Sequence, residues 1–164
     1  MNLGNMELAE QYLELPIHVE HREQPDAYEA YCQILYQKKE YEACIQAGRK
    51  LLQLGNWDWE AYVYIAKSCF ELNYLQECIR ACGQAENILP YQKIPYVIEI
   101  RVFQEVEQYA DAQTVINHYR QLVPDSDCMC YYEAVNQRAQ GQDEAAIRLL
   151  EALRKNYNNE TSDL

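Results

Sequence analysis

The sequence predicts an all-α protein built from a repeated pair of helices. Its 164 residues include only five glycines and five prolines, too few for the many turns of a β protein. Small residues recur at equal intervals, at Cys44, Cys78, Ala112 and Ala146. Two helices of about 13 residues, joined by two short turns, fill such an interval of roughly 34 residues. These observations together indicate an array of helical hairpins.

Further positions follow the same period. A tyrosine or leucine stands three residues before three of the small positions, at Tyr41, Leu75 and Tyr109. A second small residue lies 12 residues before three of them, at Cys32, Ala66 and Ala134, while Ile100 interrupts this series. Pro90 and Pro124 are separated by the same interval. Helices that cross closely need small side chains where their backbones are nearest, and a reduced cysteine can serve as one.

The period assigns two helices to each of four repeats, which span 25–58, 59–92, 93–126 and 127–160. The first helices carry the first small position, or Ile100 in its place, and are predicted over 26–38, 59–72, 93–106 and 126–140. The second helices carry the second small position and are predicted over 41–54, 75–88, 109–122 and 143–157. Residues 161–164 are predicted to form a frayed tail.

Residues 1–24 precede the first repeat and contain one further predicted helix, over 5–15. Asn5 can cap the N-terminus of this helix, and Ala9 can serve as its small residue. The segment is either the second half of a preceding repeat, which would make the chain a module of a larger protein, or an N-terminal capping helix.

The repeat resembles that of the tetratricopeptide repeat family. The second repeat carries residues that match the pattern of the family: Tyr62, Ile65, Ala66, Asn73, Leu75, Cys78 and Pro90. The fourth repeat has the turn glycine of the family at Gly141, whereas Asn56 replaces the closing proline in the first repeat. The resemblance implies an all-α, right-handed superhelix of about four repeats, in which the first helices line a concave groove.

The third and fourth repeats depart from the family pattern in their first helices. Glu99 and Glu133 stand where the family has leucine, and Ile100 stands where it has a small residue. Either these helices are rotated about their axes, or the superhelix opens there and offers a second surface for a homodimer.

Charge and cysteine content restrict the classes of partner. The chain has 26 Asp and Glu against 14 Lys and Arg, a net charge of −12, which repels phosphate backbones and anionic lipid. We therefore expect neither nucleic acid nor membrane as a partner. No apolar run approaches the roughly 18 residues of a spanning helix, and no signal-peptide pattern begins the sequence.

Seven cysteines cannot all pair within the chain, so we expect reduced thiols and a cytoplasmic location.

Three pairs of side chains raise the question of a zinc site: Cys78 with Cys82, Cys128 with Cys130, and His18 with His21. The register places the first pair in the core, and the histidine pair has no third and fourth ligand nearby. A redox or disulfide role for the second pair is the alternative to a structural one. We expect no metal and no cofactor. The absence of a nucleophile motif, a phosphate-binding loop and a recognisable acid pair predicts that the chain is not an enzyme.

The resemblance also predicts which residues face the groove. The candidates are Tyr36, Val63, Tyr64, Lys67, Phe70, Val97, Ile98, Arg101, Tyr131, Tyr132 and Arg138. Lys67 and Arg101 occupy the same position in adjacent repeats, and Arg138 lies one turn further on in the next. Tyrosine beside cations is typical of interface anchors, so we expect a protein or peptide partner with apolar anchors and acidic groups. The alternative is that these residues pack within the repeats or are covered by the C-terminal helix.

The leading functional hypothesis is a protein-interaction scaffold that binds a peptide or helix in this groove. The second is a small acidic chaperone of the type III secretion class, and the third is an accessory domain of a larger enzyme such as a glycosyltransferase. The carboxylate clamp of chaperone-binding domains is excluded. The clamp binds a carboxylate with Lys, Asn and Arg at five positions over three successive repeats. When the pattern is aligned from the first repeat, these positions hold Glu29, Gln33, Tyr64, Ile94 and Ile98. When it is aligned from the second repeat, they include a single cation, Lys67.

Overall fold

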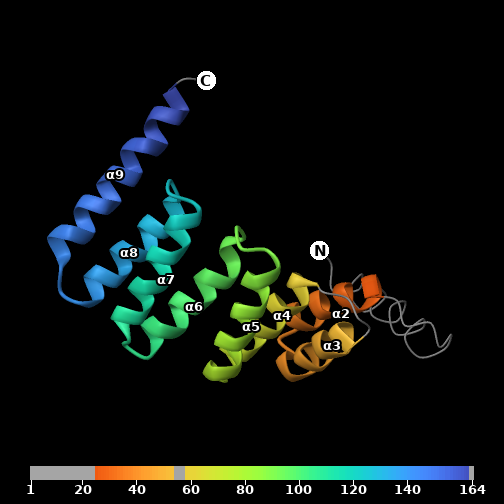
Figure 1. Cartoon of the computed structure of the whole chain (residues 1–164). Helices are drawn as coiled ribbons and strands as arrows, with labels where there is room; N and C mark the ends of the chain where they lie inside the picture. Colours follow the sequence, from red (N-terminus) through yellow and green to blue (C-terminus); the bar gives the residue numbers. More distant parts are fainter. Residues whose placement is uncertain (1–24, 54–57, 163–164) are drawn as a thin grey trace. The chain divides into compact units, whose positions relative to one another are not determined.

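The structure is a computed structural model that describes residues 25–53 and 58–162. All regular elements in these residues are α-helices (Figure 1): α2 (Pro25–Gln37), α3 (Tyr41–Gln53), α4 (Trp59–Glu71), α5 (Leu75–Ile88), α6 (Lys93–Glu105), α7 (Tyr109–Leu122), α8 (Asp127–Ala139) and α9 (Asp143–Ser162). The helix predicted over 5–15, the histidine pair and Asn56 lie outside the described residues.

The predicted helices are confirmed to within one residue at both ends for α2 to α8. The exception is the end of α9, which reaches Ser162 instead of stopping near residue 157. Residues 161 and 162 were assigned to the tail and belong instead to this helix. No glycine follows Gly141 and no proline follows Pro124, so the sequence contains no strong helix breaker in this region.

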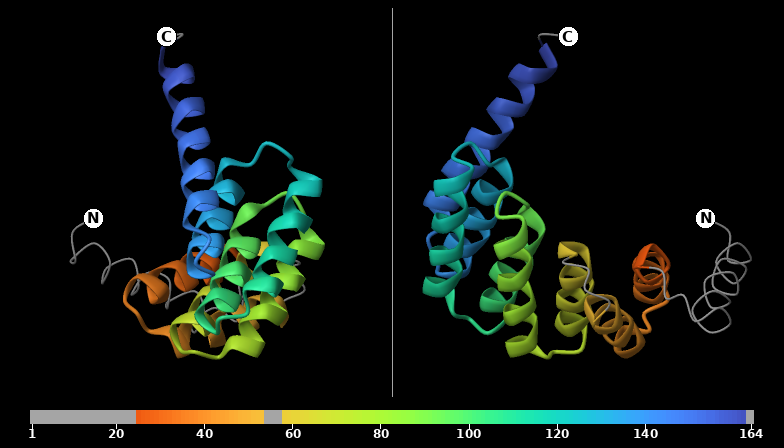
Figure 2. Two further views of the ribbon diagram at one scale, coloured as in Figure 1. Left: turned by 90° about the vertical axis from the view of Figure 1, so that its left-hand side faces the viewer. Right: turned by 45° about the vertical axis from the view of Figure 1, so that its right-hand side comes forward.

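The chain forms two compact units, Met1–Pro90 and Tyr91–Leu164, called here the N-terminal and C-terminal units. The N-terminal unit contains the hairpins α2–α3 and α4–α5, and the C-terminal unit contains α6–α7 and α8–α9. Within each unit the two helices of a hairpin pack side by side, as both views of Figure 2 show. The first helices of successive hairpins also touch, α2 against α4 and α6 against α8. Each unit is thus a stack of two helical hairpins.

The close contact inside each hairpin is made by the predicted small positions. The second helices place Cys44, Cys78, Ala112 and Ala146 in the core, where at most 4% of each residue is exposed. The thiol of Cys44 donates a hydrogen bond to the carbonyl oxygen of Cys32 over 3.3 Å. The thiol of Cys78 donates in the same way to the carbonyl oxygen of Ala66 over 3.2 Å. Cysteine at these positions therefore fills the contact and also links the two helices. Cys78 and Cys82 are both buried, as the register predicted.

The turn inside each hairpin has the same backbone geometry in all four repeats. Lys39, Asn73, Glu107 and Gly141 all have positive φ, at 64°, 60°, 58° and 76°. At the first turn, the amide of Lys39 donates to the carbonyl oxygen of Tyr36 over 3.0 Å, and the amide of Glu40 donates to that of Leu35 over 2.9 Å. Equivalent pairs of hydrogen bonds close the other three turns, which is the Schellman ending of a helix.

The turn residues differ in how well they suit this left-handed conformation. Glycine adopts it freely, asparagine tolerates it, and in other residues it costs about 1 kcal/mol or more. We expect Lys39→Gly and Glu107→Gly each to raise the free energy of unfolding by up to about 1 kcal/mol, and Gly141→Ala to lower it by about 1 kcal/mol. A Cβ at Gly141 would meet no atom within 4 Å. The stability change of Gly141→Ala therefore measures the cost of the left-handed backbone conformation alone. Urea denaturation measures all three, and an unchanged midpoint for Gly141→Ala would contradict the prediction.

Candidate functional site

The predicted groove residues all lie on the first helices of the hairpins, α2, α4, α6 and α8. They divide between the two compact units, so each set is described by itself. In the N-terminal unit these residues are Tyr36 on α2 and Val63, Tyr64, Lys67 and Phe70 on α4.

The N-terminal unit brings three of the predicted residues into contact. The Nζ atom of Lys67 lies 5.8 Å from the ring centroid of Tyr36 and 5.4 Å from that of Tyr64. The two ring centroids are 6.3 Å apart, and Tyr36 also contacts the ring of Tyr41 at 5.6 Å. Tyr64 and Lys67 are three residues apart on α4 and so share one face of the helix. We call Tyr36, Tyr64 and Lys67 the Lys67 cluster.

The Lys67 cluster combines a cation with two aromatic faces. An ammonium group over aromatic faces is stabilised by about 0.5–1 kcal/mol at a partly exposed site. Lys67 is half-buried, so part of its charge remains accessible. Burial, followed by the carboxylates of Glu60 and Glu29, raises the pKa of Tyr64 to about 12. The phenol therefore stays neutral at physiological pH and can donate a hydrogen bond beside the ammonium group.

The C-terminal unit carries a second aromatic and cationic surface. Tyr131 is 51% exposed, and its ring meets that of Tyr132 edge to face at a centroid distance of 5.3 Å. Burial raises the pKa of Tyr132, and the positive charge of Arg101 on α6 opposes that shift. Gln104 links α6 to α8 by donating to the carbonyl oxygen of Tyr132 over 3.4 Å. Arg138 lies exposed near the end of α8.

Two predicted groove residues offer almost no surface. Val63 is 4% exposed and Ile98 is 5% exposed, so the expectation that their side chains line a solvent-facing groove is corrected. Burying such a side chain is favourable by about 1.5 kcal/mol or more, which accounts for their position in the core. Phe70 and Val97 are half-buried, and Val97 packs against the core of the C-terminal unit.

Solved structures of other proteins share this arrangement of helices. A crystal structure of MamA superposes with a TM-score of 0.76 at 12% identity, covering 99% of this chain and 98% of the other. A tetratricopeptide repeat protein from Parabacteroides merdae gives 0.82 at 11% identity, over 94% of this chain and 61% of the other. TTC0263, a thermophilic TPR protein of Thermus thermophilus, gives 0.66 at 15% identity, over 96% and 91%. The chain has the tetratricopeptide repeat fold.

No protein-family model matches the sequence, and no curated protein matches it. At identities between 11% and 15%, the likeness to these structures establishes the tetratricopeptide repeat fold. The chemistry of a partner has to be argued from the residues of this chain.

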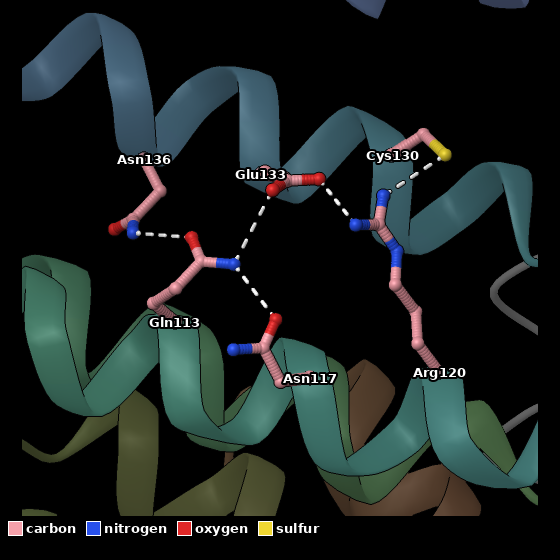
Figure 3. A network of polar contacts seen from close by, with 6 residues as sticks. All are labelled: Gln113, Asn117, Arg120, Cys130, Glu133 and Asn136. Atoms are coloured by element: carbon pink, nitrogen blue, oxygen red, sulfur yellow. Dashed lines mark hydrogen bonds and ion pairs between the residues drawn. The ribbon is translucent and has the colours of Figure 1, made fainter.

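A polar network joins α7 to α8 at a position where tetratricopeptide repeats have apolar residues (Figure 3). Glu133 forms an ion pair with Arg120 and accepts a hydrogen bond from Gln113 over 3.4 Å. Arg120 also donates to the sulfur of Cys130 over 3.1 Å. Gln113 in turn accepts a hydrogen bond from Asn136, whose Nδ2 atom lies 3.3 Å away. The network therefore surrounds the carboxylate of Glu133 with donors from α7.

This network explains the acidic residue that departs from the family pattern. Ala134, the predicted small residue of α8, is 1% exposed, so the helix keeps its expected register. The side chain of Glu133 is only 16% exposed and faces α7, where Arg120 neutralises it. The predicted rotation of α8 is therefore not needed to accommodate Glu133. The signal was present in the sequence, because Leu52 and Ile65 of the N-terminal unit stand in register with Arg120 and Glu133.

No cluster of three or more His, Cys, Asp or Glu that suits a metal ion occurs among the described residues. The hydrogen bond with Cys32 lowers the pKa of Cys44. The hydrogen bond with Cys44 and burial raise the pKa of Cys32, and burial raises that of Cys69 to about 12, so both thiols remain protonated. None of the described helices combines the length and the apolar character that a bilayer crossing requires.

The Arg120–Glu133 pair yields a test of how the fold accommodates a partly buried charge. We expect Arg120→Leu to lower the free energy of unfolding by about 2 kcal/mol, because it leaves Glu133 without its cation. Adding Glu133→Ile creates the apolar pair of the N-terminal unit and should recover most of that loss. Urea denaturation of the two single variants and the double variant measures the coupling. Additive effects of the two substitutions would show that the pair does not interact.

Proposed function

We propose that the chain is a protein-interaction module whose N-terminal unit binds an acidic peptide segment with apolar anchors at the Lys67 cluster. The observation that carries this proposal is the position of the Lys67 ammonium group over two tyrosine rings contributed by α2 and α4. A cation held in this way offers a fixed charge and an adjoining aromatic surface.

The composition of the cluster supports a peptide ligand. Tyrosine is enriched in protein interfaces because it combines a large apolar face with a hydroxyl group. The ammonium group of Lys67 can donate hydrogen bonds to a carboxylate while the rings of Tyr36 and Tyr64 pack against an apolar side chain of the same segment. The chain as a whole carries a net charge of −12, which repels acidic ligands at long range. Binding of an acidic segment would therefore depend on this local cation.

The first helices of the C-terminal unit carry residues of the same types, with Arg101 on α6 and Tyr132 and the exposed Tyr131 on α8. We propose that these residues contribute a second set of contacts of the same kind. Arg101→Glu tests this contribution separately from the Lys67 cluster.

Selection from a phage-displayed library of random short peptides tests the proposal, because the method needs no identified partner. Peptides that bind the wild-type chain should be enriched in Asp and Glu together with Phe, Trp or Leu. Lys67→Glu should weaken the selected peptides by about tenfold or more, because it replaces a charge-assisted hydrogen bond by a repulsion. Lys155→Glu makes the same change of charge on α9 and serves as the control. Selected peptides without acidic enrichment, or equal affinity for Lys67→Glu, would overturn the proposal.

A further inference from the structure

A cavity of about 140 Å³ lies in the N-terminal unit between α3, α4 and α5. Its apolar lining comes from Leu52, Tyr62, Ile65 and Ala81. A cavity of about 150 Å³ can hold a benzene molecule, so this one has room for a single isoleucine, leucine or phenylalanine side chain. The cavity is therefore large enough for one apolar anchor.

The cavity and the Lys67 cluster lie on different sides of α4. Successive residues of an α-helix are rotated by about 100°, so the side chains of Ile65 and Lys67 point about 160° apart. A ligand in the cavity would not occupy the Lys67 cluster. The inference therefore goes beyond the proposed function.

The rim of the cavity carries positive charge on an acidic protein. Arg49 forms an ion pair with Glu77. Arg80 stands on the same helix as Glu77, one turn further on, and is exposed. Within residues 28–53 and 58–155, no ion pair or hydrogen bond engages the side chain of Arg80. The rim thus has one guanidinium group left for a carboxylate of a ligand.

The matching register in the C-terminal unit carries charged side chains in place of apolar ones. Two repeat periods separate Leu52 from Arg120 and Ile65 from Glu133. In the C-terminal unit the guanidinium group of Arg120 and the carboxylate of Glu133 form an ion pair at this register, as Figure 3 shows. At this register the C-terminal unit thus has an ion pair, and the N-terminal unit has two apolar residues that line a cavity.

The chain also exposes a segment whose chemistry complements the cavity. On α9, Ile147 is 53% exposed. Glu144 and Glu151 precede and follow it by three and four residues, so all three share one face of the helix. An apolar side chain between two carboxylates matches an apolar cavity whose rim carries Arg49 and Arg80.

We propose that the cavity of the N-terminal unit binds Ile147 of a second copy of this chain. Ile147 enters the cavity, and Glu151 or Glu144 pairs with Arg80 at the rim. Each copy carries both the cavity and the anchor, so the contact can close into a dimer or continue from copy to copy. The buried surface is small, and the association is correspondingly weak and favoured by high concentration and low salt.

Sedimentation velocity from about 1 to about 300 µM tests the proposal, since weak contacts of this size associate in that range. We expect the wild-type chain to show an increasing sedimentation coefficient, as a dimer or as a series of larger species. Arg80→Glu and Ile147→Asp, both at exposed positions, should each weaken the association by about tenfold. Lys39→Glu makes the same change of charge at an exposed position in the turn between α2 and α3 and is the control. A wild-type chain that stays monomeric over the whole range overturns the proposal.

A charge exchange identifies the two surfaces. Arg80→Glu mixed with Glu151→Arg should recover association, because the carboxylate and the guanidinium group have exchanged places. Ala81→Met fills the cavity from its own wall and should abolish association while the chain stays folded by circular dichroism. If Arg80→Glu associates as strongly as the wild type, the cavity is not the contact. Lys67→Glu should leave association unchanged, so that failure of this inference and failure of the proposed function are distinguishable.

Discussion

The close approach of the two helices within each hairpin is the constraint on which the rest of the structure depends. In each repeat the contact joins two residues that are 12 apart, and all eight of these residues are buried. The sizes at this contact vary: the large Ile100 occurs opposite Ala112, Cys32 faces Cys44, Ala66 faces Cys78, and Ala134 is paired with Ala146. The contact therefore accepts pairs of different total volume, and the neighbouring side chains complete the close packing. The substitution of Ile100 for a small residue therefore leaves the hairpin intact.

The fixed length of the hairpin follows from this contact and from the turn. Each turn reverses the chain with one residue at positive φ and two hydrogen bonds to the preceding helix. Since Lys39 and Glu107 adopt the same conformation as Gly141, the geometry is imposed by the packing of the two helices and not by the preference of the turn residue. The repeat period is therefore a property of the packed hairpin, which explains why it persists where individual residues depart from the family pattern.

The sequence allowed the fold to be predicted more completely than the candidate site. Small residues at a fixed period determine where helices lie, and seven of the eight described helices matched their predicted ends to within one residue. The site depends on the direction of each side chain and on its contacts with the neighbouring hairpin. Neither can be derived from the repeat period. Val63 and Ile98 are buried although the register placed them on the groove, and the partner of Glu133 comes from α7 of the preceding hairpin. The contact of Lys67 with Tyr36 and Tyr64 required the packing of α2 against α4.

In a repeat protein, equivalent positions of different repeats can carry different side chains, because each repeat packs mainly against its neighbours. The space between a second helix and the following hairpin is open and apolar beside Leu52 and Ile65, and an ion pair occupies the corresponding register at Arg120 and Glu133. Both solutions preserve the contact between the small residues, so neither disturbs the hairpins. The partly buried ion pair requires partial desolvation of two charges, and the hydrogen bonds of Glu133 and Arg120 compensate for that cost. The apolar register avoids this desolvation and leaves a cavity that a complementary side chain can fill. Differences between repeats at one register are therefore a physical guide to binding surfaces in a protein whose backbone repeats.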